Sequence, residues 1–261
     1  YWDFNDELLI SPRATLSYFP DWEKKMSFRL SAGMYHQSPF FKELKQSDGY
    51  INYDSKAQRS FQVVGGTDLL FTAWDRPFRF TSEAYYKHMS HLVPYQVDNV
   101  RIRYLAEQEA TGYATGLDMK VNGEFVSGLQ SWASLSFLQT REDVKGDGHG
   151  MIPRPTDQWM NFSLFFQDYL PGNPSYRMQL SGFYGARLPA GPPNGERYQD
   201  VFRMPPYRRI DLGFSKVFIS AANPSEAPFF KHITDMWLSL EVFNVLDINN
   251  TISYFWVSSI Y

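Results

Sequence analysis

The polar residues of this 261-residue chain with the clearest potential for chemistry lie in short clusters. The segment GDGHG at 146–150 sets Asp147 and His149 between glycines, which suits either a metal or ligand contact or a flexible loop tip, and we favour the loop tip. His88 and His91 are three residues apart, so strand geometry sends their rings to opposite faces. The sequence therefore predicts no metal site.

Motifs for covalent or cofactor chemistry are absent from the sequence. It contains no Gly-x-Ser-x-Gly, no His-Glu-x-x-His, no phosphate-binding loop and no dinucleotide fingerprint after a strand. It also contains no cysteine, which excludes thiolate metal sites and disulfides. We therefore expect a protein that is not an enzyme and needs no cofactor. A net charge of −3 without a basic cluster argues against nucleic acid as a partner.

The polar residues recur with a period of two, which is the pattern of β-strands. In MSFRLSAGMYHQ at 26–37, Met26, Phe28 and Leu30 share one parity, whereas Arg29 has the other. Such a strand has one apolar face and one polar face. The same pattern predicts about ten strands and no convincing helix, with strands at 11–19, 26–37, 58–72, 78–88, 115–123, 124–140, 158–168, 175–185, 208–218 and 237–244.

The connectors between these strands alternate between two lengths. Short turns rich in Pro, Asn and Gly are expected at 20–25, 74–77, 121–124 and 171–174. Long connectors are expected at 38–56, 91–110, 142–157 and 188–207. A sheet with this rhythm carries tight turns at one end and extended loops at the other, as transmembrane barrels do. The connector at 219–235 breaks the rhythm, being long where a short one is expected.

Two classes of all-β protein fit the alternation, a membrane barrel and a soluble β-sandwich. Several predicted strands reach ten residues or more, whereas strands in globular proteins usually have about 5–6 residues. The polar parity mixes Ser, Gln, Gly and Asn with both signs of charge, which suits a crowded, wet interior. An aromatic content of 18% supplies the Tyr and Trp that gather at membrane interfaces. We predict an all-β fold, a transmembrane antiparallel β-barrel.

Three segments resemble TonB-dependent outer-membrane receptors, particularly those of the Bacteroidetes. SPRATLSYFP and FRLSAGMYHQSPFFKEL, within 11–44, resemble the middle-to-late barrel of the family. PPYRRIDLGFSKVF at 205–218 resembles the region of the third-from-last strand, and LEVFNVLDINNTISYFWV at 240–257 resembles the penultimate strand. The resemblance covers essentially the whole chain. Residues 1–261 are therefore expected to form a single region, the C-terminal part of the receptor barrel.

The resemblance implies about ten strands of a barrel of about 22, with the plug domain and the last strand absent. Tyr261 would then end a fragment. The short turns would face the periplasm, with Trp22 and Trp74 at that interface. The implied location is the bacterial cell outer membrane. Implied partners are outer-membrane lipid, the plug and first half of the same receptor's barrel, TonB through the missing N-terminal part and, as a further candidate, a surface lipoprotein.

The function implied by the resemblance is uptake of a scarce nutrient, such as a siderophore, haem, cobalamin, an oligosaccharide or a peptide. The alternative is a structural or secretion-associated outer-membrane barrel that acts as an interaction platform. A third option is a small closed barrel of about ten strands acting alone as an enzyme or adhesin, and the absence of paired catalytic groups counts against the enzyme.

Two sets of residues follow as candidates for function. Long extracellular loops would bind the cargo through side chains able to stack or pair with it, namely Tyr50, Tyr53, Tyr95, Tyr104, His149, Arg154 and Tyr198. Charged residues on the polar parity would face the barrel lumen and pair with one another, with water or with a plug, since isolated buried charges are costly. These are Arg29, Arg79, Glu83, Lys87, Asp118, Lys120, Arg177, Arg209, Asp211 and Glu241.

Overall fold

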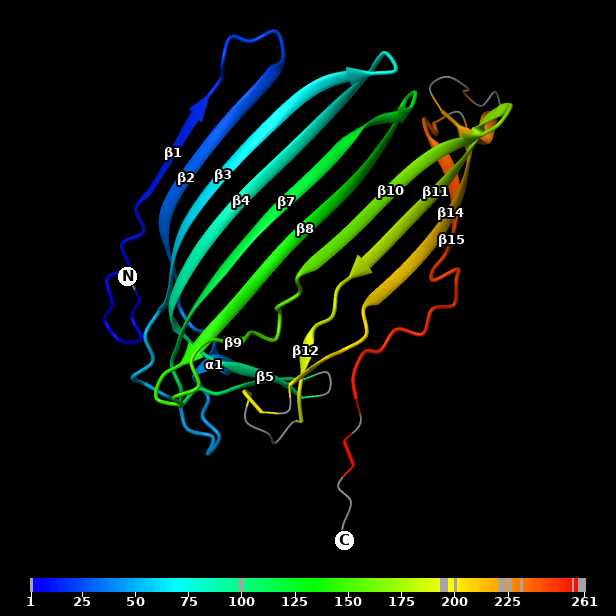
Figure 1. Cartoon of the computed structure of the whole chain (residues 1–261). Coiled ribbons are helices and arrows are strands. Elements are labelled where there is room, and N and C mark those ends of the chain that lie inside the picture. Colours follow the sequence, from blue (N-terminus) through cyan, green and yellow to red (C-terminus); the bar gives the residue numbers. More distant parts are fainter. Residues whose placement is uncertain are drawn as a thin grey trace.

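The computed structural model of the chain is one large, curved antiparallel sheet (Figure 1). It describes residues 2–98, 101–192, 197–199, 201–220, 224, 227–230, 232–254 and 256–257. The elements are β1 (Arg13–Tyr18), β2 (Lys25–Gln37), α1 (Phe41–Leu44), β3 (Gln58–Ala73), β4 (Arg76–Leu92), β5 (Tyr95–Asp98), β6 (Arg101–Tyr104), β7 (Ala110–Val126), β8 (Leu129–Val144), β9 (Ile152–Pro153), β10 (Met160–Leu170), β11 (Asn173–Gly185), β12 (Pro189–Ala190), β13 (Phe202–Arg203), β14 (Tyr207–Ile219), η1 (Pro228–Phe230) and β15 (Met236–Val242).

The strands of the main sheet follow the order of the chain. Ten of them form the path β1-β2-β3-β4-β7-β8-β10-β11-β14-β15, and β9 pairs with β8. The pairs β5–β6 and β12–β13 form two small hairpin sheets inside long connectors. Each of the ten predicted strands corresponds to one strand on this path. The predicted all-β, antiparallel fold of about ten strands is therefore confirmed.

The connectors divide the sheet into two different ends (Figure 1). At one end, hairpins turn through Trp74 and Asp75, with φ of 50° and 58°, and through Pro171 and Gly172, where φ is 79° at the glycine. Two consecutive residues with positive φ match the twist of a two-residue hairpin. At the other end, the long connectors carry α1, β5, β9 and β12. The alternation of short and long connectors follows the prediction.

One predicted turn is wrong in position. Residues 121–124 lie inside β7, and the chain turns instead between Val126 and Leu129, where Gly128 has a φ of 76°. Gly123 serves close packing rather than a turn, because a Cβ there would lie 2.5 Å from Cδ1 of Phe78 and 2.6 Å from the carbonyl oxygen of Pro77. The absence of a side chain lets the neighbouring strand and its ring approach.

In the described part of the chain, helix is confined to two short pieces, so the prediction of no convincing helix needs only a small correction. α1 has four residues, and its start is capped by Glu43, whose Oε2 accepts a hydrogen bond of 2.8 Å from the backbone N–H of Phe40. η1 is a 3₁₀ turn of three residues in the connector after β14. Within the described residues, no helix is long and apolar enough to span a membrane.

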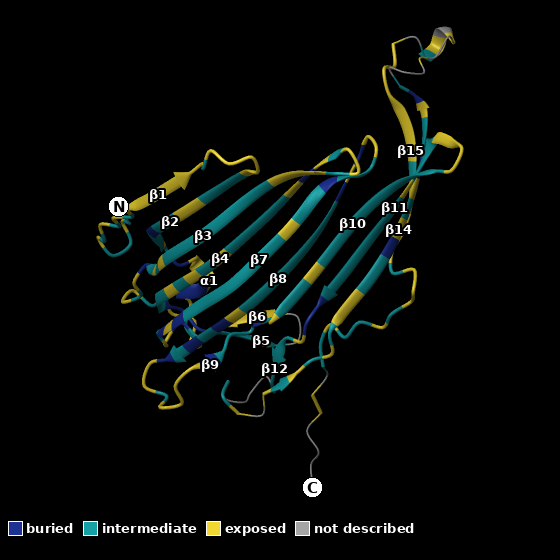
Figure 2. Ribbon diagram, turned by 45° about the horizontal axis from the view of Figure 1, so that its top comes forward, coloured by how far each residue is buried: buried dark blue, intermediate teal, exposed yellow. Residues whose placement is uncertain are grey.

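The sheet is a single layer without a large apolar core, as the burial colours in Figure 2 show. The apolar cluster is small and consists of Leu92, Ala110, Val144 and Ile152, at the long-connector end of β4, β7, β8 and β9. The largest fully buried side chains of the described residues are Glu142, Pro94 and Ser131, two of which are polar. Soluble domains instead bury one sheet face against a second layer.

The connector from 220 to 235 is long, as the sequence indicated. Its described part includes η1, with Phe229 exposed to solvent. Residues 221–223, 225–226 and 231 of this connector lie outside the described residues, and so does Tyr261.

Candidate functional site

The register of the sheet assigns every side chain to one of two faces. Residues directly opposite one another in an antiparallel pair point to the same side. Arg29 is paired with Gly66, Gly66 with Glu83, Glu83 with Asp118, and Asp118 with Ser136. The register continues across the remaining strands and brings all ten predicted charges to this face, which we call the polar face.

The opposite face, which we call the apolar face, carries large exposed side chains on strands from one edge of the sheet to the other. It includes Leu30, Phe61, Phe162, Leu212 and Leu240. Nothing in the described part of the chain packs over these residues as a second layer. The two parities that the sequence distinguishes are therefore two physical faces of different polarity.

Asp68 organises the ion pairs of the polar face on β2, β3 and β4. Its carboxylate lies 2.8 Å from Nη2 of Arg79 and 3.5 Å from Nη2 of Arg29, and it accepts a hydrogen bond of 2.8 Å from Oγ1 of Thr81. Glu83 lies 4.0 Å from Arg29. Asp68 was missed at the sequence level because 58–72 is the least regular of the predicted strands. Asp68 has the same parity as Gly66, and this parity could have predicted its place on the polar face.

The other predicted charges of the polar face lie in smaller groups. Arg209 pairs with Asp211 at 2.9 Å, and Asp211 also accepts a hydrogen bond of 2.8 Å from the backbone N–H of Asn244. Arg209 also lies 5.0 Å from the ring of Phe183. Three further cations lie beside rings: Lys87 is 5.1 Å from Tyr85, Lys120 is 5.2 Å from Trp132, and Arg177 is 5.9 Å from Tyr169. Such contacts suit a face that is polar but lined with rings.

The seven residues predicted to bind cargo fall into three groups at the long-connector end. Tyr95 and Tyr104 are directly paired in the β5–β6 hairpin with ring centroids 6.0 Å apart, and the guanidinium of Arg154 lies 5.8 Å from the ring of Tyr95. His149 and Tyr198 stack with ring centroids 3.3 Å apart.

The third group, Tyr50 and Tyr53, lies on the connector between β2 and β3. Tyr53 stacks on Phe4 at 5.2 Å, and Phe4 stacks on Trp2 at 5.3 Å. Tyr50 is exposed. The structure therefore does not join the seven residues into one site.

Two buried carboxylates hold the long connectors against the polar face. Glu142, at the end of β8, has no exposed surface, and its Oε2 lies 3.0 Å from Nε of Arg154. Its Oε1 accepts a hydrogen bond from Nη1 of Arg197, which also donates to the carbonyl of Pro153 through Nη2 at 3.2 Å. The connector before β10 and the connector after β11 are thus joined through the side chain of Glu142.

Asp157, in the connector that follows β8, is the second of these buried carboxylates. It pairs with Nη2 of Arg203 at 2.5 Å and accepts a hydrogen bond of 2.8 Å from the backbone N–H of Thr140. Glu142 and Asp157 were both missed at the sequence level because 142–157 was predicted as an open loop. Glu142 shares the parity of Ser136 and Thr140, and this continuation of the strand pattern could have revealed it.

Two groups in the outer connectors have shifted pKa values. Partial burial raises the pKa of Glu107, but hydrogen bonds from Oγ and the backbone N–H of Ser47, at 2.6 Å and 2.5 Å, lower it more, so the pKa lies below its usual range. Burial, followed by the charge of Glu43 and the neighbouring Tyr95, raises the pKa of Tyr104 above its ordinary value. Tyr104 therefore keeps its proton at neutral pH and acts as a hydrogen-bond donor or a stacking surface.

The described residues form no metal site, either at His88 and His91 or at a cluster of acidic side chains. His88 lies on the apolar face by register, opposite Phe61, whereas His91 has a φ of 54° and contacts Glu109 at 2.8 Å. Among the described residues, no group of three or more His, Asp and Glu side chains is arranged to hold a metal ion.

The fold is that of part of the barrel wall of an outer-membrane receptor. Among solved structures, the chain is similar to the crystal structure of the ferric-catecholate import receptor Fiu from E. coli K12, with a TM-score of 0.62 and 15% identity. The match covers 92% of this chain and 31% of the receptor, so the chain spans about a third of that receptor's length. No protein-family model and no curated protein matches the sequence.

Proposed function

We propose that the chain forms part of the barrel of a TonB-dependent outer-membrane receptor that imports a scarce nutrient. One observation carries the proposal: a single-layer, 11-stranded sheet separates exposed apolar side chains on one face from charged and ion-paired side chains on the other. In this proposal, residues 1–261 form one region, the C-terminal part of the barrel.

The physical argument concerns the solvent that each face requires. Large apolar side chains such as Leu30, Leu212 and Leu240 would be costly in water but stable in hydrocarbon. The polar face has charges whose partners lie across neighbouring strands, as Asp68 has in Arg29 and Arg79. A wet lumen bounded by lipid supplies both environments at once.

The direction of the sheet follows from its two ends. Barrels of this kind have short periplasmic turns and longer extracellular loops. Trp22 and Trp74, exposed near the short turns, would then lie at the periplasmic interface, where such rings are enriched. The long connectors with their tyrosines, His149 and Arg154 would meet the external medium and the cargo.

Import of this type makes and breaks no covalent bond in the cargo, so the chain would contribute a binding surface and a passage. The candidate cargoes are a siderophore, haem, cobalamin, an oligosaccharide and a peptide. Proposed partners are outer-membrane lipid, the plug and first half of the barrel, TonB acting through the plug and a surface lipoprotein. The solved structure to which the chain is similar is titled as a ferric-catecholate import receptor, which supports the transport class.

Growth on defined nutrients tests the proposal. A strain lacking the gene should grow as wild type on rich medium and fail when one scarce compound is the sole source of iron, cobalamin or carbon. Restoring the complete gene should restore growth. Normal growth of the mutant on all such sources would contradict import and favour a barrel that acts as an interaction platform.

A further inference from the structure

We infer that a cavity among the outer connectors binds one small, uncharged, apolar ring, between benzene and indole in size. The cavity has a volume of about 200 Å³. None of the seven residues predicted to bind cargo is among the described residues that line it. The inference rests on the proposed function only in assigning these connectors to the cargo-facing side.

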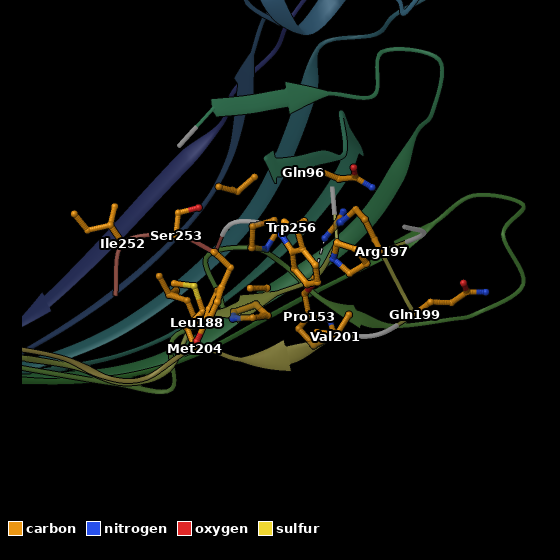
Figure 3. Close-up of a pocket in the computed structure, with 17 residues that line it drawn as sticks. Gln96, Pro153, Leu188, Arg197, Gln199, Val201, Met204, Ile252, Ser253 and Trp256 are labelled. Carbon is orange, nitrogen blue, oxygen red and sulfur yellow. Dashed lines mark hydrogen bonds between the residues drawn. The ribbon is translucent and has the colours of Figure 1, made fainter. Parts of the chain in front are cut away.

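Four segments distant in sequence form the walls of the cavity. They are β5, the end of β9 and Pro155 after it, described residues of the connector that carries β12 and β13, and residues 252–254 and 256. Figure 3 shows Trp256 near the middle of the lining side chains, with Gln96 on one side and Leu188 and Met204 on the other. Most of the lining is apolar, including Val97, Pro153, Leu188, Met204, Ile252 and Trp256.

The size of the cavity sets the size of the ligand. An apolar cavity of about 150 Å³ in another protein stays dry and binds benzene. A cavity of about 200 Å³ therefore has room for one ring or a fused pair. The cavity is partly open to solvent, and Trp256 in its lining is 42% exposed, so a ring at the end of a larger cargo could also enter.

The aromatic wall of the cavity is held in place by edge-to-face contacts. Phe202 of β13 lies 6.1 Å from Trp256 at an interplanar angle of 61° and 5.0 Å from Tyr254 at 78°. Lining prolines have fixed φ and lose little freedom on binding. A preformed wall of this kind lowers the entropy cost of binding a flat ligand.

The charge of the cavity selects against an anionic ligand. Of the described residues that line it, only Arg197 is charged, and its guanidinium is bound to the carboxylate of Glu142 and the carbonyl of Pro153. Its side chain is largely buried in these contacts. A ligand carboxylate would therefore have to compete with Glu142 for this guanidinium.

Binding of 5-fluoroindole to the complete protein in lipid nanodiscs tests the inference by ¹⁹F NMR, with empty nanodiscs as the partition baseline. The wild type should bind the probe saturably. Met204→Trp fills the cavity and should weaken binding roughly tenfold or more. Met151→Trp is the matched control, because Met151 is exposed on a neighbouring connector and does not line the cavity.

Ala190→Phe is a second variant that fills the cavity. The gel mobility of unheated and heated protein reports whether each variant is folded. Loss of binding in a folded filling variant, with the control unchanged, supports the inference. Absence of saturable binding in the wild type, unchanged binding in both filling variants, or equal loss in Met151→Trp overturns it. The assay needs no TonB, so the two proposals can fail separately. Normal nutrient import without binding of 5-fluoroindole contradicts only the ligand proposed for the cavity. Binding of 5-fluoroindole without import contradicts only the transport proposal.

Discussion

At the scale of single residues, Glu142 joins two long connectors of the outer surface, and it was not predicted from the sequence. Its buried carboxylate faces Arg154 from one connector and Arg197 from the next. Removing one partner of a buried ion pair leaves an uncompensated charge, which is far costlier than losing a surface pair. Glu142 therefore positions both connectors without itself facing the cargo.

Glu142→Gln should loosen these connectors. The substitution keeps the shape of the side chain but leaves two guanidiniums without their counter-charge, at an expected cost of ~3–5 kcal/mol. Limited trypsin digestion of the complete protein should then cleave the connectors 145–159 and 186–206 faster than in wild type. Asp143→Asn, the next position in β8, is the matched control, because Asp143 forms no ion pair among the described residues. Equal cleavage of both variants would contradict the role of Glu142.

The hydrogen bonds between Ser47 and Glu107 in the outer connectors should be sensitive to acid. Its pKa is lowered in the folded protein, so its hydrogen bonds from Ser47 stabilise the fold above the ordinary glutamate value of about 4.3 and are lost as the pH falls through the lowered pKa. Hydrogen–deuterium exchange of residues 46–52, corrected for intrinsic rates, should therefore rise below about pH 4.

Glu107→Gln should abolish most of that pH dependence, because its amide does not titrate. Glu124→Gln, at the short-turn end where Glu124 binds the backbone N–H of Gly128, should leave it intact. Unchanged pH dependence in Glu107→Gln would assign the effect to another group.

The charged residues were more predictable than the loop residues. Parity alone brought Arg29, Glu83 and Asp118 to one face, because a period of two is a property of the strand itself. Parity carries no information about connectors, whose conformation depends on contacts such as that of Glu142 with Arg197. The seven predicted loop residues therefore fell into three separate groups, and the cavity around Trp256 was not predicted.

At the scale of elements, the ten strands were predictable and one turn was not. Asn122-Gly123 has the composition of a tight hairpin, yet the strand continues through it because Phe78 packs where a side chain would be. The turn lies five residues later, at Ser127-Gly128, where the Ser-Gly pair and the positive φ of Gly128 mark it. Tertiary packing overrode a local turn signal.

Gly123→Ala should destabilise the sheet at this position. Its Cβ would lie 2.5 Å from the ring of Phe78, so β4 and β7 would have to separate, at a cost of about 1–3 kcal/mol. Gly65→Ala is the matched control, because Gly65 is also a strand glycine on the apolar face and a Cβ there would meet nothing within 4 Å. Thermal unfolding followed by gel mobility should shift for Gly123→Ala only. A similar shift for both would mean that the contact with Phe78 is unimportant.

At the scale of the whole molecule, the proposed barrel requires a different solvent on each of its two faces. A sheet with a single layer and few buried apolar residues is not stable as a soluble domain. In the proposed barrel, lipid on the apolar face and water on the polar face would resolve this difficulty without a second layer. The alternation and the strand length from which the sequence predicted a membrane barrel are both present in the structure.

Cysteine labelling in intact cells tests this central claim most directly. The chain has no cysteine of its own, so Leu30→Cys and Tyr50→Cys each introduce a single thiol into it. Leu30 is 53% and Tyr50 is 73% exposed on the chain itself, so only the surroundings can separate their reactivity. An impermeant maleimide should label Tyr50→Cys in cells, and it should label Leu30→Cys only after the protein is denatured. Equal labelling of both thiols in intact cells would contradict a lipid-facing apolar surface.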